Sequence, residues 1–239
     1  MKEIKAQIVL VGGSSSLTMA KKTCELCGKK PHVVIFPTAR ADAPEIIEET
    51  CGFYSKFAES VDVIKLIAES PEIDKLKQRI EKADLIYIPG GATANIKEAW
   101  AKYGVDKYVL EAICKEDKVI VGSSAGAMVL SYSCVEVDCG NEYAGGYEVI
   151  PAFFSPHYQL PDWKGFDKFL ENNTEPKLAF SAGDDAGVLF TPDGKYYTFF
   201  GEEGNSVWRF VYDESFAKWQ RKEFPHGDDT DITVSAEGA

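Results

Sequence analysis

The sequence predicts an α/β fold: a three-layer sandwich in which a mostly parallel β-sheet lies between helices. Two observations support this prediction. Short apolar runs that end at glycine or proline recur over residues 8–121, as is typical of parallel strands buried on both faces. Segments with helical spacing of apolar residues separate these runs, and this alternation produces a parallel sheet covered by helices.

Five strands are expected in the first half of the chain, and four of them are followed at once by glycine or proline. They cover residues 8–11, 32–36, 61–66, 85–88 and 118–121. Three helices are expected between them. Residues 42–45 (DAPE) have the spacing of a capping box, Ser70 and Pro71 resemble a cap and a first-turn proline, and the helix after Gly91 should end at Gly104.

The second half of the chain differs in composition, because glycines and aromatic residues become frequent beyond about residue 131. Residues 195–200 (KYYTFF) follow the turn sequence PDG at 192–194, which predicts a strand of an antiparallel pair. We expect one domain over residues 1–222. Residues 223–239 hold five acidic residues and no lysine or arginine, so a frayed acidic tail is expected there.

Composition limits the function. Hydrophobic residues are 45% of the 239 residues, enough for a sizeable core. A net charge of −12 disfavours nucleic acids and anionic membranes as partners. No apolar stretch approaches a membrane span, and the N-terminus lacks a signal-peptide apolar region, so a cytoplasmic protein is expected, as a monomer or homodimer.

Six cysteines are scattered singly through apolar patterns. Cys24 and Cys27 have CxxC spacing, which is compatible with a redox or metal pair. No second CxxC or histidine cluster accompanies them. We therefore expect these two cysteines to be packing residues of a helix. We also expect no metal or organic cofactor.

The strongest functional signal is residues 122–127 (GSSAGA), which follow the strand at 118–121 directly. A Gly-x-Ser-x-Gly pattern between a strand and a helix can form a nucleophile elbow, with Ser124 exposed at the turn. The backbone N–H of Ala125 would then point at a developing oxyanion. Gly90 and Gly91, at the end of another strand, suit the other half of an oxyanion hole, although they also suit a plain turn.

A serine nucleophile needs a base, and the chain has three histidines. His157 lies in residues 153–158 (FFSPHY), where aromatic and proline neighbours would hold an imidazole in place. His32 begins a strand and His226 lies in the acidic tail, so His157 is the expected base. A carboxylate should orient it, and the candidates after the elbow are Glu136, Asp138, Glu142, Asp184 and Asp185.

Taken together these residues resemble the peptidase E (aspartyl dipeptidase) and cyanophycinase family of serine peptidases. The resemblance rests on Gly12-Gly13, residues 88–91 (IPGG), 122–127 (GSSAGA) and 155–158 (SPHY), and on the pair at 184–185. It implies a class I glutamine-amidotransferase-like fold with Ser124 and His157 in the catalytic positions. The family's acidic position maps best onto Asp185, with Asp138 as the alternative. Gly90 and Tyr158, inside the matching motifs, are expected to contact substrate.

One departure from the family concerns specificity. Peptidase E has an arginine-containing segment after its catalytic histidine, whereas residues 159–168 here (QLPDWKGFDK) contain no arginine. A carboxylate-selective pocket requires a buried cation, ideally the planar fork of arginine. Strict selectivity for an aspartyl side chain is therefore not expected unless Arg40 or Arg209 reaches the pocket.

The expected function is a serine-type peptidase, dipeptidase-like, that hydrolyses short peptides through Ser124, His157 and Asp185. Two alternatives remain open at this point. An esterase of the α/β-hydrolase type has the order Ser, Asp, His and would require His226. An amidotransferase-like domain that binds a small molecule without turnover is the non-enzymatic alternative.

Overall fold

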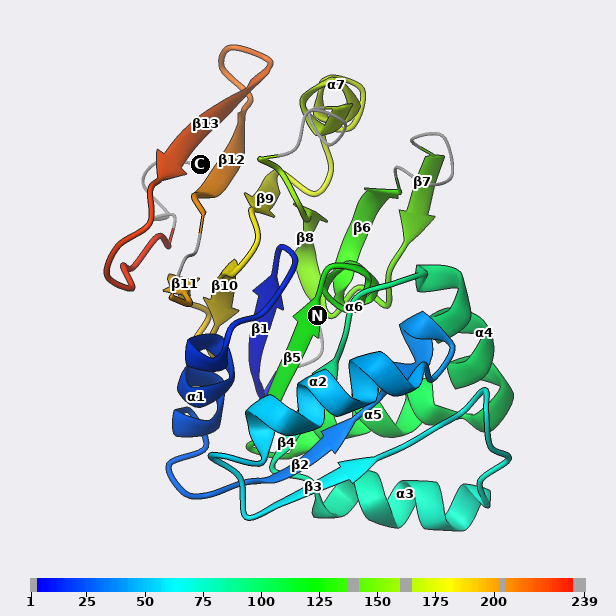
Figure 1. Cartoon of the computed structure of the whole chain (residues 1–239). Coiled ribbons are helices and arrows are strands. Elements are labelled where there is room, and N and C mark those ends of the chain that lie inside the picture. The colour runs from blue at the N-terminus through cyan, green and yellow to red at the C-terminus, as the bar shows by residue number, and fades with distance from the viewer. Residues whose placement is uncertain (1–3, 137–141, 160–164, 203–204, 234–239) are drawn as a thin grey trace.

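The computed structural model describes residues 4–136, 142–159, 165–202 and 205–233 (Figure 1). One sheet contains β1 (Gln7–Val11), β2 (His32–Ile35), β3 (Ser60–Val63), β4 (Leu85–Ile88), β5 (Val119–Ser123), β10 (Ala186–Phe190) and β11 (Tyr196–Phe200). The other contains β6 (Ser131–Glu136), β7 (Glu142–Gly145), β8 (Ile150–Ser155), β9 (Leu178–Ala182), β12 (Val207–Asp213) and β13 (Lys218–Phe224). The helices are α1 (Leu17–Glu25), α2 (Pro44–Tyr54), α3 (Ile73–Lys82), α4 (Thr93–Tyr103), α5 (Val105–Lys115), α6 (Ala125–Leu130), α7 (Gly165–Glu171) and the 3₁₀ turn η1 (Pro37–Arg40).

The first sheet has the strand order β11-β10-β1-β5-β4-β2-β3. The five strands from β1 to β3 in this order pair in parallel, whereas β10 and β11 are antiparallel to their neighbours. The mostly parallel α/β sheet predicted from the sequence is therefore confirmed. The hairpin between β10 and β11 also agrees with the antiparallel pair expected around the turn at 192–194.

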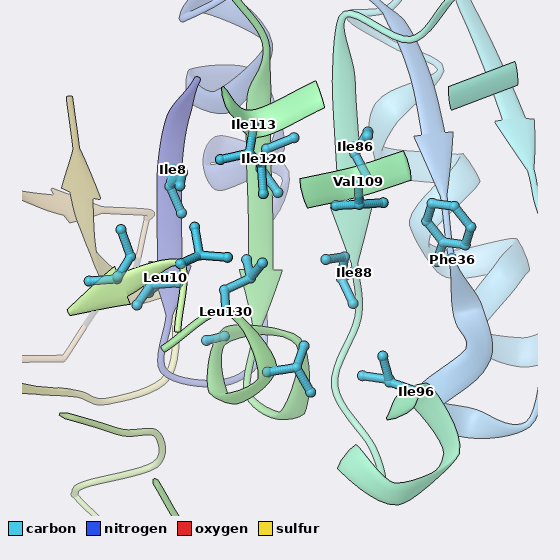
Figure 2. Packing of buried hydrophobic residues seen from close by; sticks show 14 of the residues in the cluster. Ile8, Leu10, Phe36, Ile86, Ile88, Ile96, Val109, Ile113, Ile120 and Leu130 are labelled. Carbon is cyan, nitrogen blue, oxygen red and sulfur yellow. The ribbon is translucent and has the colours of Figure 1, made fainter. Parts of the chain in front are cut away.

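Alternate residues of the parallel strands face opposite helical layers. Ile8, Leu10, Ile86, Ile88 and Ile120 pack in one cluster with α3, α4, α5 and α6 (Figure 2). Val9, Val11, Leu85, Val119 and Val121 pack on the other face with α1 and α2. Because both faces of the sheet are covered, the strands inside it are apolar at almost every position, whereas the edge strand β3 is not.

The second sheet, in the order β13-β12-β9-β8-β6-β7, was not expected from the sequence. It lies beyond the carboxyl ends of β1 and β5 (Figure 1). Phe154 of β8 and Phe180 of β9 belong to the same core cluster as the first sheet. The opposite face carries Phe153 and Phe210, which pack with Phe166 of α7 in a separate aromatic cluster.

Two helix starts differ from the prediction. The helix α2 begins at Pro44 without a side-chain cap, and the carboxylate of Asp42 instead accepts the N–H groups of Ile67 (2.6 Å) and Ala68 (2.9 Å). The helix α3 begins at Ile73 after Glu72, so Ser70 does not cap it. The end of α4 is as predicted, since Gly104 adopts the left-handed conformation (φ 69°).

The expected acidic tail is wrong as far as Thr233. Residue 223 is inside β13, and the segment that follows returns to β11. Ile232 is 1% exposed and its N–H donates to the carbonyl of Tyr196 (2.8 Å). Asp229 forms an ion pair with Lys22 (2.7 Å). The segment up to Thr233 therefore packs against β11 even though it is acidic. Residues 234–239 lie outside the described residues.

The CxxC pair lies at the end of α1, as the packing interpretation expects. Cys24 is buried and Cys27 half-buried, and both are free thiols. Burial raises the pKa of Cys24 to about 11 and that of Cys27 to about 12. Among the described residues no group of three or more His, Cys, Asp or Glu side chains is placed to hold a metal ion, and no helix has the length and apolarity of a membrane span.

Candidate active site

Ser124 lies at the sharp junction between β5 and α6. Its backbone has φ 49° and ψ −112°, a conformation that a residue other than glycine rarely adopts and that is typical of a strained functional turn. Two hydrogen bonds hold this turn: the Ser124 N–H donates to the Val11 carbonyl (2.9 Å), and the Met128 N–H donates to the Ser124 carbonyl (2.9 Å). The serine hydroxyl is thereby presented at the carboxyl edge of the sheet.

The small residues around Ser124 are required by close backbone approaches. A Cβ atom on Gly122 would lie 2.3 Å from the Gly126 carbonyl oxygen. One on Gly126 would lie 2.0 Å from the Ile88 carbonyl oxygen. These approaches explain the glycines of the Gly-x-Ser-x-Gly motif, because β5, α6 and β4 meet here without room for side chains.

His157 follows β8 of the second sheet and points back at the elbow. Its Nε2 lies 2.9 Å from the Ser124 hydroxyl oxygen. The residue has a left-handed backbone (φ 51°), and its N–H donates to the Gly12 carbonyl (2.7 Å). The hydrogen bond to Gly12 therefore ties the base to the end of β1, one residue beyond Val11, whose carbonyl accepts the Ser124 N–H.

The carboxylate bonded to His157 is that of Asp184, not Asp185. The Oδ1 atom of Asp184 lies 2.7 Å from His157 Nδ1. The Asp184 carbonyl accepts the N–H of Asn205 (3.1 Å), which helps to fix the turn between β9 and β10. The assignment of Asp185 as the orienting carboxylate is corrected accordingly. Asp138, the alternative, lies outside the described residues.

Asp185 has a different position in the same turn. It is 7% exposed, and its carboxylate accepts the N–H groups of Ser16 (2.8 Å) and Glu202 (2.8 Å). Its own N–H donates to the Ser14 carbonyl (2.8 Å). The Asp185 side chain thus joins the loop after β1 to the loop after β11. Two adjacent aspartates in a turn gave no sequence signal to distinguish these two environments.

Gly13 has a role that the sequence analysis missed. A Cβ atom there would lie 1.7 Å from Asp184 Oδ1 and 2.6 Å from the ring of His157. The Gly13 carbonyl also accepts a short hydrogen bond from the Ser123 hydroxyl. Gly13 therefore leaves space for the histidine–carboxylate pair while its backbone contacts the serine turn. Glycines at 12 and 13 were visible in the sequence, but only the fold shows which side chains they accommodate.

The two expected oxyanion donors follow the carboxyl ends of neighbouring strands, β5 and β4. Ala125 is the first residue of α6, so its N–H belongs to the unpaired first turn of the helix. Gly91 follows β4, which pairs with β5. Its φ of 144° and its approach to Ala39, whose carbonyl would be 2.4 Å from a Cβ, both require glycine. Gly90 packs against Ser124, with 2.9 Å from a Cβ position to the serine Cβ.

A pocket opens in front of Ser124 and His157, with a cavity volume of about 150 Å³. Gly90, Gly91, Ser14 and Ser15 line the wall near the serine. The elements η1 and α2 also line the pocket, through the side chains of Arg40, Ile46, Glu49, Thr50 and Phe53. Sequence reasoning named none of the α2 residues as part of the site, because helical periodicity alone does not show which exposed face borders a pocket.

Tyr158 is not among the described residues that line this pocket. Its ring packs against Trp208 (4.9 Å between centroids), and its hydroxyl donates to Asp167 (2.6 Å). Burial, followed by the hydrogen bond to Asp167, raises the pKa of Tyr158. The expectation that Tyr158 contacts substrate is therefore not supported by its position. It supports the second sheet instead.

The other two histidines lie elsewhere. His32 Nδ1 lies 2.7 Å from the Ser60 hydroxyl at the start of β2 and β3, which is the opposite end of the parallel strands from Ser124. The ring of His226 packs on Phe200 (5.2 Å between centroids). Of the three histidines, only His157 borders the described pocket.

Comparison with known proteins agrees with this geometry. Residues 8–196 match peptidase family S51. The chain belongs to this family. Peptidase activity is thereby supported at the level of the family. A relative of similar length is the uncharacterized peptidase YgaJ of Bacillus subtilis (strain 168), with 26% identity over 190 residues, covering 78% of this chain and 80% of the relative.

Two solved structures share the fold of this S51 chain. A peptidase from an acI-B1 Actinobacterium superposes with a TM-score of 0.72 and 17% identity, covering 97% of this chain and 99% of that one. A candidate peptidase E protein from Listeria monocytogenes EGD-e has a TM-score of 0.64 and 18% identity, covering 82% and 99%. The peptidase E-like, class I glutamine-amidotransferase-like fold expected from the motifs is confirmed.

Proposed function

We propose that this S51 family member is a serine-type peptidase that hydrolyses short peptides, with Ser124 as nucleophile, His157 as base and Asp184 as the orienting carboxylate. The supporting observation is the continuous hydrogen-bonded series from the Ser124 hydroxyl through His157 (2.9 Å) to Asp184 (2.7 Å) at the edge of a pocket. These contacts meet the geometric requirement for an activated nucleophile, which is a base within hydrogen-bond reach that a third group orients.

In the proposed reaction the Ser124 oxygen attacks the scissile carbonyl carbon while His157 Nε2 takes the hydroxyl proton. The imidazolium then gives this proton to the amide nitrogen, the C–N bond breaks, and an acyl-enzyme remains. A water molecule then attacks the acyl carbon and loses its proton to His157. The ester C–O bond breaks as the imidazolium gives this proton to the Ser124 oxygen, which releases the acid product and regenerates the serine. Asp184 accepts the Nδ1–H throughout, which fixes the ring tautomer and stabilises the imidazolium.

The oxyanion formed at each step would accept hydrogen bonds from the N–H groups of Ala125 and Gly91. Ala125 adds the positive end of α6, and Gly91 adds a backbone that can approach closely because it carries no side chain. The Ser124 N–H is unsuited to this role, since it already donates to Val11. The small pocket favours a short substrate segment on its η1 and α2 side.

The two alternative functions are less well supported by the geometry. An esterase of the α/β-hydrolase type would use His226, but that ring packs on Phe200. A binding domain without turnover would have no need for the strained Ser124 backbone with His157 and Asp184 aligned behind it. The free Cys24, Cys27, Cys51 and Cys114 thiols are compatible with a reducing compartment, and we propose a cytoplasmic location.

The proposal is tested by labelling with a fluorophosphonate and by hydrolysis of a dipeptide library. We expect the wild-type protein to be labelled once per chain and Ser124→Ala to lose both labelling and hydrolysis, by about 10⁴-fold or more. Ser123→Ala is the matched control, because its hydroxyl points away to the Gly13 carbonyl and labelling should remain. Retention of more than about a tenth of the activity by Ser124→Ala would refute the assignment.

A further inference from the structure

The pocket contains one pair of opposite charges that the proposed mechanism does not use. Among the described residues that line it, Arg40 is the one Lys or Arg and Glu49 the one carboxylate. Arg40 comes from the end of η1, and Glu49 from the face of α2 that also carries Ile46 and Phe53. Both side chains are exposed, so the cation that borders the nucleophile's pocket is at its solvent side, not buried as the sequence analysis required, and comes from an element far from His157 in sequence.

The backbone next to Arg40 is hydrogen-bonded to the segment that follows β4, where Gly91, one of the two expected oxyanion donors, lies. The carbonyl of Ala39, the preceding residue, accepts the N–H of Ala92 (2.9 Å) and the side-chain amide of Asn95 (3.3 Å). Ala39 also makes the close approach that requires glycine at 91. After Arg40 the chain turns through two left-handed residues, Ala41 and Asp42. The backbone that carries Arg40 therefore lies beside Gly91.

The charges of Arg40 and Glu49 are not neutralised by neighbours in the described part of the chain. No ion pair within 4.0 Å joins either side chain to another described residue, although thirteen ion pairs of Lys or Arg occur elsewhere in the described part. By contrast Arg221, near Tyr158, is paired with Asp167 (3.1 Å). An arginine that borders a pocket with its planar fork unpaired can bind a carboxylate in two parallel hydrogen bonds.

We propose that Arg40 is a specificity-determining residue that binds a carboxylate group of the substrate. This inference rests on the proposed peptidase function and deepens it. Glu49 restricts where such a group can lie, because a carboxylate near α2 would be repelled while one near η1 is attracted. The carboxylate belongs either to an acidic side chain or to the C-terminus of a short peptide, and the chemistry at Arg40 is the same for both. The relaxed specificity expected from residues 159–168 is revised, since the cation enters from η1.

The test compares matched substrates that differ only in one carboxylate. Asp-Leu is compared with Asn-Leu for a side-chain carboxylate, and Ala-Leu with Ala-Leu-amide for a C-terminal one. We expect the wild-type kcat/KM to favour the acid in one of the two pairs. Arg40→Gln should reduce that preference about 10- to 100-fold, as expected for loss of a charge-assisted pair. Arg40→Lys should restore part of it, since the charge remains but the fork is lost.

Two variants serve as matched controls. Glu49→Gln removes a charge from the same pocket and should keep or increase the preference for the acid. Arg221→Gln removes an arginine outside the pocket and should leave the preference unchanged. An acid-to-amide ratio in Arg40→Gln within twofold of wild type for both pairs would overturn the inference, as would a loss of preference in Arg221→Gln alone.

A binding measurement separates this inference from the proposed function. Calorimetric titration of Ser124→Ala protein with the same dipeptides measures affinity without turnover. If the wild-type protein hydrolyses no peptide but the Ser124→Ala protein binds the acid more tightly in an Arg40-dependent way, the peptidase proposal fails and the role of Arg40 stands. If hydrolysis occurs and neither rate nor affinity depends on Arg40, the peptidase proposal stands and the role of Arg40 fails. Absence of both hydrolysis and binding would refute both.

Discussion

The two sheets supply different parts of the candidate site. The seven-stranded sheet holds Ser124 after β5 and Gly91 after β4, whereas the six-stranded sheet holds His157 after β8. Asp184 lies where the chain passes from β9 of the second sheet to β10 of the first. The nucleophile therefore depends on one sheet and the base on the other. Their alignment therefore depends on the contact between the two sheets. We call this contact, where Gly12 and Gly13 lie against His157 and Asp184, the seam.

The largest expected effect separates the two aspartates of the seam. Asp184→Asn should lower kcat/KM by up to about 10⁴-fold, because an amide can present N–H to the ring and favour the wrong tautomer. Asp185→Asn should lower turnover far less but reduce the free energy of unfolding by about 1–3 kcal/mol, since its carboxylate accepts two backbone N–H groups. Steady-state kinetics and denaturant unfolding on both variants measure the difference.

The reverse result would restore the assignment made from the sequence. If Asp185→Asn lost turnover and Asp184→Asn kept it, the orienting carboxylate would be Asp185 and the Asp184–His157 hydrogen bond would have no catalytic role. Equal small effects would instead point to a carboxylate outside the pair.

A second prediction tests the seam itself. Gly13→Ala places a methyl group where Asp184 Oδ1 and the His157 ring now lie, so the histidine must shift relative to Ser124. A displacement of about 1 Å can cost ~10²-fold in rate, and we expect a loss of that order in kcat with a smaller change in KM. Gly52→Ala is the control, because that helical position has open space and should be neutral or slightly stabilising. Unchanged kcat in Gly13→Ala would show that the seam tolerates repacking.

The contrast between the sheets also explains how much the sequence could predict. Four of the five parallel strands contain continuous apolar runs because both of their faces are buried, and each of these runs ends at glycine or proline; β3 is the exception. The elbow motif and Ser124 could be placed for the same reason. In the second sheet β13 has mostly exposed side chains, so its hydrophobic pattern is too weak to predict a strand, and the predicted tail begins at residue 223, inside it.

The site residues that escaped prediction are those whose position depends on tertiary contacts. Helical spacing suggested that α2 forms, but nothing local shows that Glu49 and Phe53 face a pocket. The choice between Asp184 and Asp185 depends on which way a turn between two sheets directs adjacent side chains. His157 was identifiable because only three histidines exist and its neighbours are aromatic. Tyr158, in the same motif, was misplaced because its side chain faces the other side of the second sheet.

A smaller effect is expected where the C-terminal segment joins the first sheet. Ile232 is 1% exposed and lies in the main core cluster, so Ile232→Ala should reduce the free energy of unfolding by about 2 kcal/mol. Because residue 232 is remote in the fold from Ser124, kcat/KM at 25 °C should change less than twofold. Ile73→Ala is the control, since Ile73 is 50% exposed. A neutral Ile232→Ala would indicate that the segment behaves as the loose tail first expected.

The smallest effect is expected at Cys24, near the end of α1, and at Cys27, just beyond it, because neither residue lines the pocket at Ser124. Burial is the main cause that raises the pKa of both thiols, to about 11 and about 12, so both remain protonated at neutral pH. Only the thiolate is a good nucleophile or metal ligand. We therefore expect iodoacetamide at pH 7.5 to leave both residues unmodified in the folded protein, with reaction increasing only as the pH approaches 11.

Substituting both by alanine should leave kcat/KM unchanged within about twofold, apart from a modest loss of stability through packing. Mass spectrometry of the alkylated protein, with guanidinium-unfolded protein as the positive control, measures the modification. Zinc titration provides the second readout, and one equivalent bound by the wild-type protein but not by the double variant would show instead that the CxxC pair is a metal site.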